Sequence, residues 1–203
     1  MTHAEAIEHN QSHGIGKVTN KTVFGFWVYI MTDGILFASL FAVYAVLHNS
    51  TFGGPGGQQL FSMPYVMAET LVLLTSGYTC GLAMLSLRRN HKNKTLFWFG
   101  VTCLLGFAFL TIELTDFRHL VIIGDSWRRS GFLSAFFALV GTHGLHISVG
   151  LLWMIVLLSK VWSKGLTAAN NRRLQLLSIF WHFLDIIWIF IFTIVYLRGA
   201  LGL

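Results

Sequence analysis

The chain is predicted to be an all-α membrane protein, folded as a bundle of five transmembrane helices. Of its 203 residues, 55% are hydrophobic and only 11% are charged, whereas soluble domains carry about 25% charged residues. Its mean hydropathy is +0.66. Five apolar stretches reach the length of roughly 20 residues that a helix needs to cross a bilayer. Together these observations exclude an ordinary soluble enzyme.

The five apolar stretches set the expected elements, because a backbone in lipid must satisfy its hydrogen bonds internally. Alternation with a period of two, typical of a membrane barrel, is absent from the sequence. We expect helices at residues 23–47, 64–87, 95–112, 131–159 and 174–197. They form one domain, residues 23–203. Residues 1–22 are expected to be a polar, disordered tail, and the first stretch an uncleaved span, since no small-residue cleavage site follows it.

The distribution of lysine and arginine predicts the orientation of these helices. Ten of the 14 basic residues lie in the N-terminal tail and in the connections on the same side of the membrane, and four lie on the opposite side. The positive-inside rule therefore places the N-terminus in the cytoplasm and the C-terminus in the periplasm. The net charge of +6 is explained by this topology, so it gives no independent argument for binding nucleic acid.

Ionisable side chains fall within the predicted helices, where a charge is costly and a functional site is the default hypothesis. Their depth, at about 1.5 Å per helical residue, divides them into a cytoplasmic, a central and an outer group. In that order the groups are Asp33, His182 and Asp185; His143 and His146; and Glu69 and Glu113, with Asp116 beside Glu113.

A spacing of three residues places three pairs of these groups on shared helix faces. The pairs are His143 with His146, His182 with Asp185, and Glu113 with Asp116. A carboxyl group one turn from a histidine can share a proton or a hydrogen bond with it, which lowers the cost of burying both. Two interpretations stay open: a proton-handling network, or a structural network that fixes the helix at 131–159 against that at 174–197. The sequence favours the structural network, with no catalytic residue.

No cofactor and no metal site are expected in this chain. Cys80 and Cys103 are isolated, so they can build neither an iron–sulfur cluster nor a binuclear copper site. His146 and His182 could in principle form a bis-histidine haem site, but bulky neighbours crowd both residues. A copper site would need three convergent ligands, and no spacing in the sequence suggests them.

Two motifs carry a family resemblance, RSGFLSAFFALVGTHGLH at residues 129–146 and FWHFLDIIW at residues 180–188. They are similar to motifs in subunit III of haem–copper terminal oxidases, and the similarity extends over residues 23–198. Asp33 resembles the buried carboxylate of that family, at the position where the cytochrome c oxidase members carry a carbodiimide-reactive glutamate. Glu113 matches the acidic motif that closes its helix in the family.

The resemblance implies a supporting subunit of an oxidase complex in the bacterial inner membrane. Most members have seven helices, and the five-helix form resembles subunit III of cytochrome bo-type ubiquinol oxidases or of another quinol oxidase. By this resemblance, haem b, haem o and copper belong to subunit I, which reduces oxygen and pumps protons. The implied partners are subunit I as the main contact, subunits II and IV, and membrane lipids. This chain would stabilise subunit I and support proton uptake, with Asp33 as the proton-related residue.

Two functions of other classes remain as alternatives. A stand-alone proton-coupled carrier would use Asp33, His182 and Asp185, and it would transport its substrate without partner subunits. A haem-binding membrane cytochrome would show haem absorbance in the isolated chain.

Overall fold

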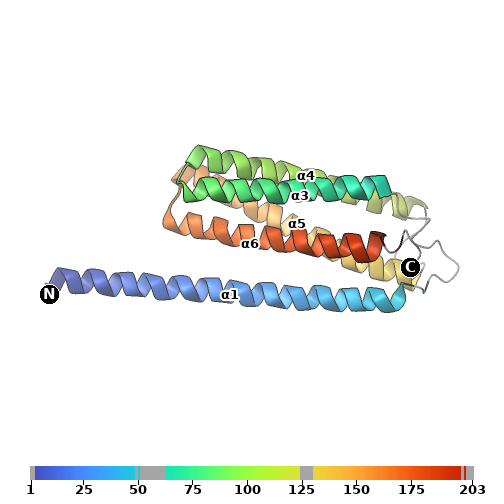
Figure 1. Cartoon of the computed structure of the whole chain (residues 1–203), viewed down its shortest axis with the longest axis horizontal. Helices are drawn as coiled ribbons and strands as arrows, with labels where there is room; N and C mark the ends of the chain where they lie inside the picture. Colours follow the sequence, from blue (N-terminus) through green and yellow to red (C-terminus); the bar gives the residue numbers. More distant parts are fainter. Residues whose placement is uncertain (1–2, 49, 51–62, 124–129, 198, 200–203) are drawn as a thin grey trace. The chain divides into compact units, whose positions relative to one another are not determined.

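The computed structural model describes residues 3–48, 50, 63–123, 130–197 and 199, with side chains described from residue 21 onward except at positions 63 and 123. This part of the chain consists of helices and the turns between them, without a strand (Figure 1). The helices are α1 (His3–Leu47), α3 (Met63–Arg88), α4 (Lys92–Ile123), α5 (Gly131–Lys164) and α6 (Ala168–Ile191), and α6 continues as a short π-helix, η1 (Phe192–Leu197).

Five helical segments are long and apolar enough to cross a membrane, which confirms the predicted all-α class and the predicted number of spans. The segments are Lys21–Leu47, Pro64–Arg88, Lys92–Ile122, Gly131–Lys164 and Ala168–Leu197. The orientation of the two termini stays a prediction.

Several helices extend beyond the predicted bounds. The helix α1 begins at His3, so the tail that we expected to be disordered is helical, and no proline before Pro55 interrupts it. The helix α4 continues past residue 112 to Ile123. Hydropathy underestimated this helix because Glu113, which ended the apolar stretch, is buried inside the bundle. The helix α6 begins at Ala168, before the predicted start at residue 174.

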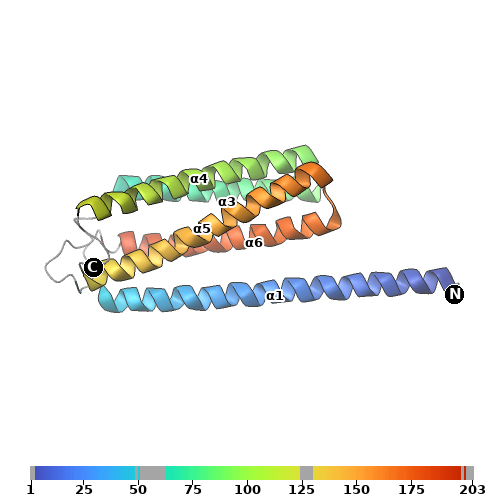
Figure 2. The ribbon, with the colours of Figure 1, turned by 180° about the vertical axis from the view of Figure 1, so that it is seen from behind.

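Contacts within the chain divide it into two units, residues 1–36 and 37–203. The described part of the first unit is a single helical segment, most of α1. The second unit contains the end of α1 and all other helices. Within it α3 packs most extensively on α4. The helix α5 packs on both α4 and α6, and α6 packs on α3 (Figures 1 and 2).

Short turns join α3 to α4 and α5 to α6. Asn90 adopts a left-handed conformation with φ of 56° between α3 and α4, which asparagine tolerates better than most residues. Gly165 ends α5 with φ of 74°, and its N–H donates to Val161 O at 2.9 Å. The Thr167 hydroxyl accepts from Asn170 N at 3.3 Å and so caps α6. The connection between α5 and α6 is therefore short and well defined.

Two buried tryptophans of the second sequence motif attach α6 to α3. Trp181 Nε1 donates to Ser76 Oγ at 3.0 Å, and Trp188 Nε1 donates to Thr70 Oγ1 at 3.1 Å. Both hydroxyls in turn donate to backbone carbonyls within α3. Because both indoles are fully buried, these bonds satisfy N–H groups that would otherwise be costly to bury.

Breaking the contact between Trp188 and Thr70 is expected to weaken the packing of α3 on α6. Trp188→Phe and Thr70→Ala should each lower the free energy of unfolding, with a coupling energy of about 0.5–1 kcal/mol, since hydrogen bonds between membrane helices are individually modest. Unfolding of the reconstituted chain, followed for both single variants and the double variant, measures this coupling. Thr75→Ala is the control because the Thr75 hydroxyl donates to Leu71 O within α3. Strict additivity of Trp188→Phe and Thr70→Ala would contradict the prediction.

Candidate functional site

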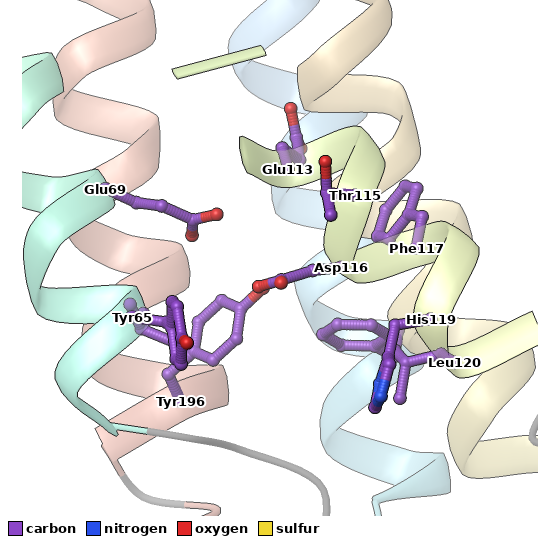
Figure 3. Close-up of a pocket in the computed structure, with 11 residues that line it drawn as sticks. Tyr65, Glu69, Glu113, Thr115, Asp116, Phe117, His119, Leu120 and Tyr196 are labelled. Atoms are coloured by element: carbon purple, nitrogen blue, oxygen red, sulfur yellow. The ribbon is translucent and has the colours of Figure 1, made fainter. Parts of the chain in front are cut away.

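A cavity of about 330 Å³ lies among residues of α3, α4, α5 and η1. Three carboxyl groups line it, Glu69 on α3 and Glu113 and Asp116 on α4 (Figure 3). Most of the remaining lining is aromatic or apolar: Tyr65, Val66, Phe117, Leu120, Phe136 and Tyr196. Sequence analysis had assigned these three residues to one group because they lie at a similar depth. The structure places all three around the same cavity.

The deepest carboxyl groups of this cavity are almost completely buried. Glu69 is 1% exposed and Glu113 is 3% exposed. Within the described residues, Glu69 Oε1 and both carboxyl oxygens of Glu113 have no hydrogen-bond partner. The charged neighbours that act on Glu113 are Glu69 and Asp116, both acidic. Asp116 is only half-buried and interacts with the exposed His119 one turn further along α4.

Gly144 in the first sequence motif makes room for Glu113. A Cβ atom at position 144 would lie 2.8 Å from Glu113 Oε2 and 3.1 Å from Oε1, which is closer than a carbon and an oxygen normally approach. Gly141, on the preceding turn of α5, differs, because a Cβ atom there would lie 3.7 Å from Phe117 Cε2, an ordinary contact. The absence of a side chain at position 144 therefore lets the Glu113 carboxyl group pack directly against α5.

His143 lies at the centre of an aromatic cluster. Its ring is completely buried, with centroid distances of 5.3 Å to Trp188, 6.0 Å to Phe109 and 6.4 Å to Phe37. Neither of its ring nitrogens has a hydrogen-bond partner in the part of the chain that the structure describes. His143 therefore acts here as a packed aromatic side chain that joins α5 to α4, α6 and the end of α1.

The two other histidines in the predicted network bond to their own helices. His146 Nδ1 donates to Thr142 O at 2.7 Å, and His182 Nδ1 donates to Ser178 O at 2.7 Å. Each uses one ring nitrogen to satisfy a backbone carbonyl one turn earlier. The bonds keep these histidines along α5 and α6 and do not join them to each other.

The spacing would allow a bond between His182 and Asp185, but the described structure does not form it. His182 bonds to backbone, and the Asp185 carboxyl group packs closely against Gly77 on α3. Asp185 Oδ1 has no hydrogen-bond partner among the described residues. Both residues line a shallow groove between α3 and α6, together with Gly77 and Gly81. Asp185 therefore contributes to the α3–α6 contact, whereas we had predicted one between α5 and α6.

Asp33 belongs to the first unit of the chain. It is 8% exposed, and the side chain of Tyr29, one turn earlier in α1, hydrogen-bonds with it. A phenol one turn away gives this carboxyl group a polar neighbour on its own helix. Sequence analysis had identified Asp33 but not the contribution of Tyr29.

Among the described residues, no cluster of three or more His, Cys, Asp or Glu side chains is arranged to hold a metal ion. Cys80 and Cys103 are buried free thiols. Cys80 Sγ lies 3.5 Å from Ser178 Oγ on α6, so this thiol takes part in helix packing.

Sequence analysis missed the residues that receive the polar side chains. Gly77 and Gly144 accommodate carboxyl groups, and Ser76 and Thr70 accept from tryptophans. Gly144 alone carried a signal, its place between two histidines of the first motif. The others could not be recognised without knowing which helices are neighbours.

The chain matches the family model described as cytochrome c oxidase subunit III over residues 5–200. It is 55% identical over 199 residues to the cytochrome bo(3) ubiquinol oxidase subunit 3 of Pseudomonas aeruginosa, which covers 98% of this chain and 94% of that relative. Its identity to the same subunit of Pseudomonas putida is 52% over 180 residues, or 89% of this chain and 87% of the relative. The cytochrome c oxidase subunit 3 of Bacillus sp. (strain PS3) is 43% identical over 178 residues, or 88% of this chain and 86% of the relative.

Adding a methyl group at position 144 is expected to displace Glu113 and destabilise the bundle. Gly144→Ala should lower the free energy of unfolding by about 1–3 kcal/mol, the usual cost of overpacking a tight contact. Gly141→Ala on the same helix is the matched control and should have a much smaller effect, because its Cβ atom would meet only an ordinary contact. Unfolding of the reconstituted chain checks both. Equal stability of the two variants would contradict the proposed contact.

Proposed function

The chain belongs to the cytochrome c oxidase subunit III family, and we propose that it is the non-catalytic subunit III of a proton-pumping terminal quinol oxidase. The observation that carries this proposal is an identity of 55% over 98% of the chain to a ubiquinol oxidase subunit 3. In such a complex, subunit I would hold haem b, haem o and copper and reduce oxygen to water. This chain would stabilise subunit I and support its proton uptake.

The relatives also bear on the electron donor of the proposed complex. The two Pseudomonas relatives, at 55% and 52% identity, are ubiquinol oxidase subunits. The Bacillus PS3 relative, at 43% identity, is a cytochrome c oxidase subunit. The higher identity to the former pair supports ubiquinol as the donor.

A stand-alone proton carrier is not favoured. The reported relatives are all named as oxidase subunits. In addition, His182 bonds to its own helix and not to Asp185, so the proton path that the carrier would need through these two residues lacks its predicted link.

The proposed setting is a multi-pass position in the bacterial inner membrane, with the N-terminus in the cytoplasm and the C-terminus in the periplasm. The five membrane-spanning segments support the multi-pass arrangement, and the excess of basic residues on the N-terminal side supports the orientation. Large apolar side chains are exposed along every helix from α1 to α6, as expected for surfaces that meet lipid or other subunits. Subunit I is the main proposed contact, with subunits II and IV and membrane lipids as further partners.

Purification through a tag on this chain in a mild detergent tests the proposal. We expect haem absorbance and a larger membrane subunit to travel with the chain, and oxygen consumption to depend on added ubiquinol. Stripping this chain away alone should leave the haem with the larger subunit. Haem retained by the isolated chain, or a chain that purifies without partners and transports protons, would overturn the proposal.

Replacing Asp33 is expected to slow the oxidase without preventing its assembly. Asp33→Asn removes a buried carboxyl group, and the loss in turnover should stay below about 100-fold, the lower bound for loss of an essential acid–base catalyst. Oxygen consumption per haem, and its decline during sustained turnover, are the measurements. Thr32→Ala is the control on the same helix, because the Thr32 hydroxyl donates to the backbone at Tyr29 O. Unchanged turnover and lifetime of Asp33→Asn would remove Asp33 from this role.

A further inference from the structure

The cavity among α3, α4, α5 and η1 has a property that the role of an accessory subunit does not explain. Two of its carboxyl groups, Glu69 and Glu113, are at least 97% buried. One oxygen of Glu69 and both oxygens of Glu113 meet no donor in the described residues. Buried polar atoms are normally hydrogen-bonded, and leaving them without a partner costs about 1–3 kcal/mol each. The Glu69 carboxyl group points into the space between α3 and α4 (Figure 3), so something other than these protein atoms is expected to meet its unpartnered oxygen.

The charges around the cavity show what this occupant must supply. The titratable groups that line it are Tyr65 and Glu69 on α3, Glu113, Asp116 and His119 on α4, and Tyr196 on η1. The lining contribution of α5 is Phe136, which has no charge. Tyr44, near the end of α1, also interacts with Tyr196. Of these described groups, only His119 can become positively charged, and it is exposed and beside Asp116.

Ionised Glu69 and Glu113 would repel each other strongly, because both are almost completely buried. A directly coordinated metal ion is not favoured, since no cluster of ligands among the described residues is arranged to hold one. Neighbouring carboxyl groups in other proteins relieve the same repulsion by binding protons, and they then titrate as a coupled unit. Protons are therefore the simplest compensating charge for Glu69 and Glu113.

The cavity is also large and polar enough to hold water. Its volume of about 330 Å³ exceeds several times the roughly 30 Å³ that one water molecule takes up in the liquid. The hydroxyl-bearing residues Tyr65, Thr115 and Tyr196 line it together with the three acidic residues. Figure 3 shows the Glu69 and Asp116 carboxyl groups pointing toward one another across the space between α3 and α4. Water placed between them would supply the missing hydrogen bonds.

We propose that this cavity is a proton-binding site, in which Glu69 and Glu113 share an exchangeable proton with enclosed water. Tyr65, Thr115 and His119 form its opening, because they are the exposed members of the lining. When a proton enters from the aqueous phase it adds to a carboxylate oxygen to give a carboxylic acid, and its release restores the carboxylate. Gly144 holds the site in shape by keeping Glu113 against α5.

Infrared difference spectroscopy of the full chain, purified with whatever subunits accompany it, tests the proposal. Between acidic and alkaline buffer we expect a titrating carbonyl stretch of a protonated carboxyl group, which shifts in D2O because the enclosed proton exchanges. Glu113→Gln should abolish this band or its titration, and Glu69→Gln should shift the midpoint of what remains. Asp185→Asn is the matched control, since Asp185 is also buried with an unpartnered oxygen but lies outside the cavity.

Three results would overturn the proposal. The first is a wild-type spectrum without a titrating, exchangeable carboxyl band. The second is a band that survives in both cavity variants but disappears in Asp185→Asn. The third is a tightly bound inorganic cation, found by elemental analysis and lost in Glu113→Gln, which would make the cavity a cation site. If the Gln variants fail to assemble, deuterium exchange in the unmodified protein and a shifted band in Gly144→Ala still decide the question.

Discussion

The lack of water in the hydrocarbon region is the constraint on which the arrangement of this bundle depends. A polar group on a membrane helix has to find its partner on its own helix or on a neighbouring one. Most of the described serine and threonine hydroxyls find their partner on their own helix. They donate to a carbonyl one turn earlier, as Thr111 and Ser148 do. The indoles of Trp181 and Trp188 instead find their partners on a neighbouring helix, because they donate to hydroxyls on α3. Because these bonds are directional, they set how α6 lies along α3 in a way that apolar packing alone would not.

Glycine complements these bonds by letting carboxyl groups approach a neighbouring helix. Asp185 packs on Gly77, and Glu113 packs on Gly144. In both pairs a short residue on one helix faces an acid on another, so the acid is shielded from lipid by backbone and not by a bulky side chain. The same principle explains why small residues are frequent where membrane helices meet. It also separates two kinds of glycine in this chain, since Gly81 and Gly100 have open space where a Cβ atom would lie.

The helical class and the five spans could be predicted from the sequence, because both depend on length and hydropathy along single helices. The outer position of the carboxylates stays a prediction. Sequence analysis predicted helix ends poorly where polar residues continue the helix, as beyond Glu113 in α4. Spacing allowed a bond between His182 and Asp185 but could not show that His182 bonds to Ser178 O on its own helix. Spacing also could not show that Asp185 meets α3. The cavity at Glu69 and Glu113 combines residues of several helices, so only the packed structure could reveal it.

The π-helix at Phe192–Leu197 has a consequence for comparing this chain with its relatives. A π-turn closes with one residue more than an α-turn, so this segment offsets the chain by a residue relative to a continuous α-helix. The π-helix includes Tyr196, which lines the cavity with Glu69, Glu113 and Asp116. A relative that lacked one residue here could continue α6 as an ordinary α-helix and would present a different side chain to the cavity. Single-residue gaps in this segment are thus a natural marker for which relatives keep a tyrosine in that place.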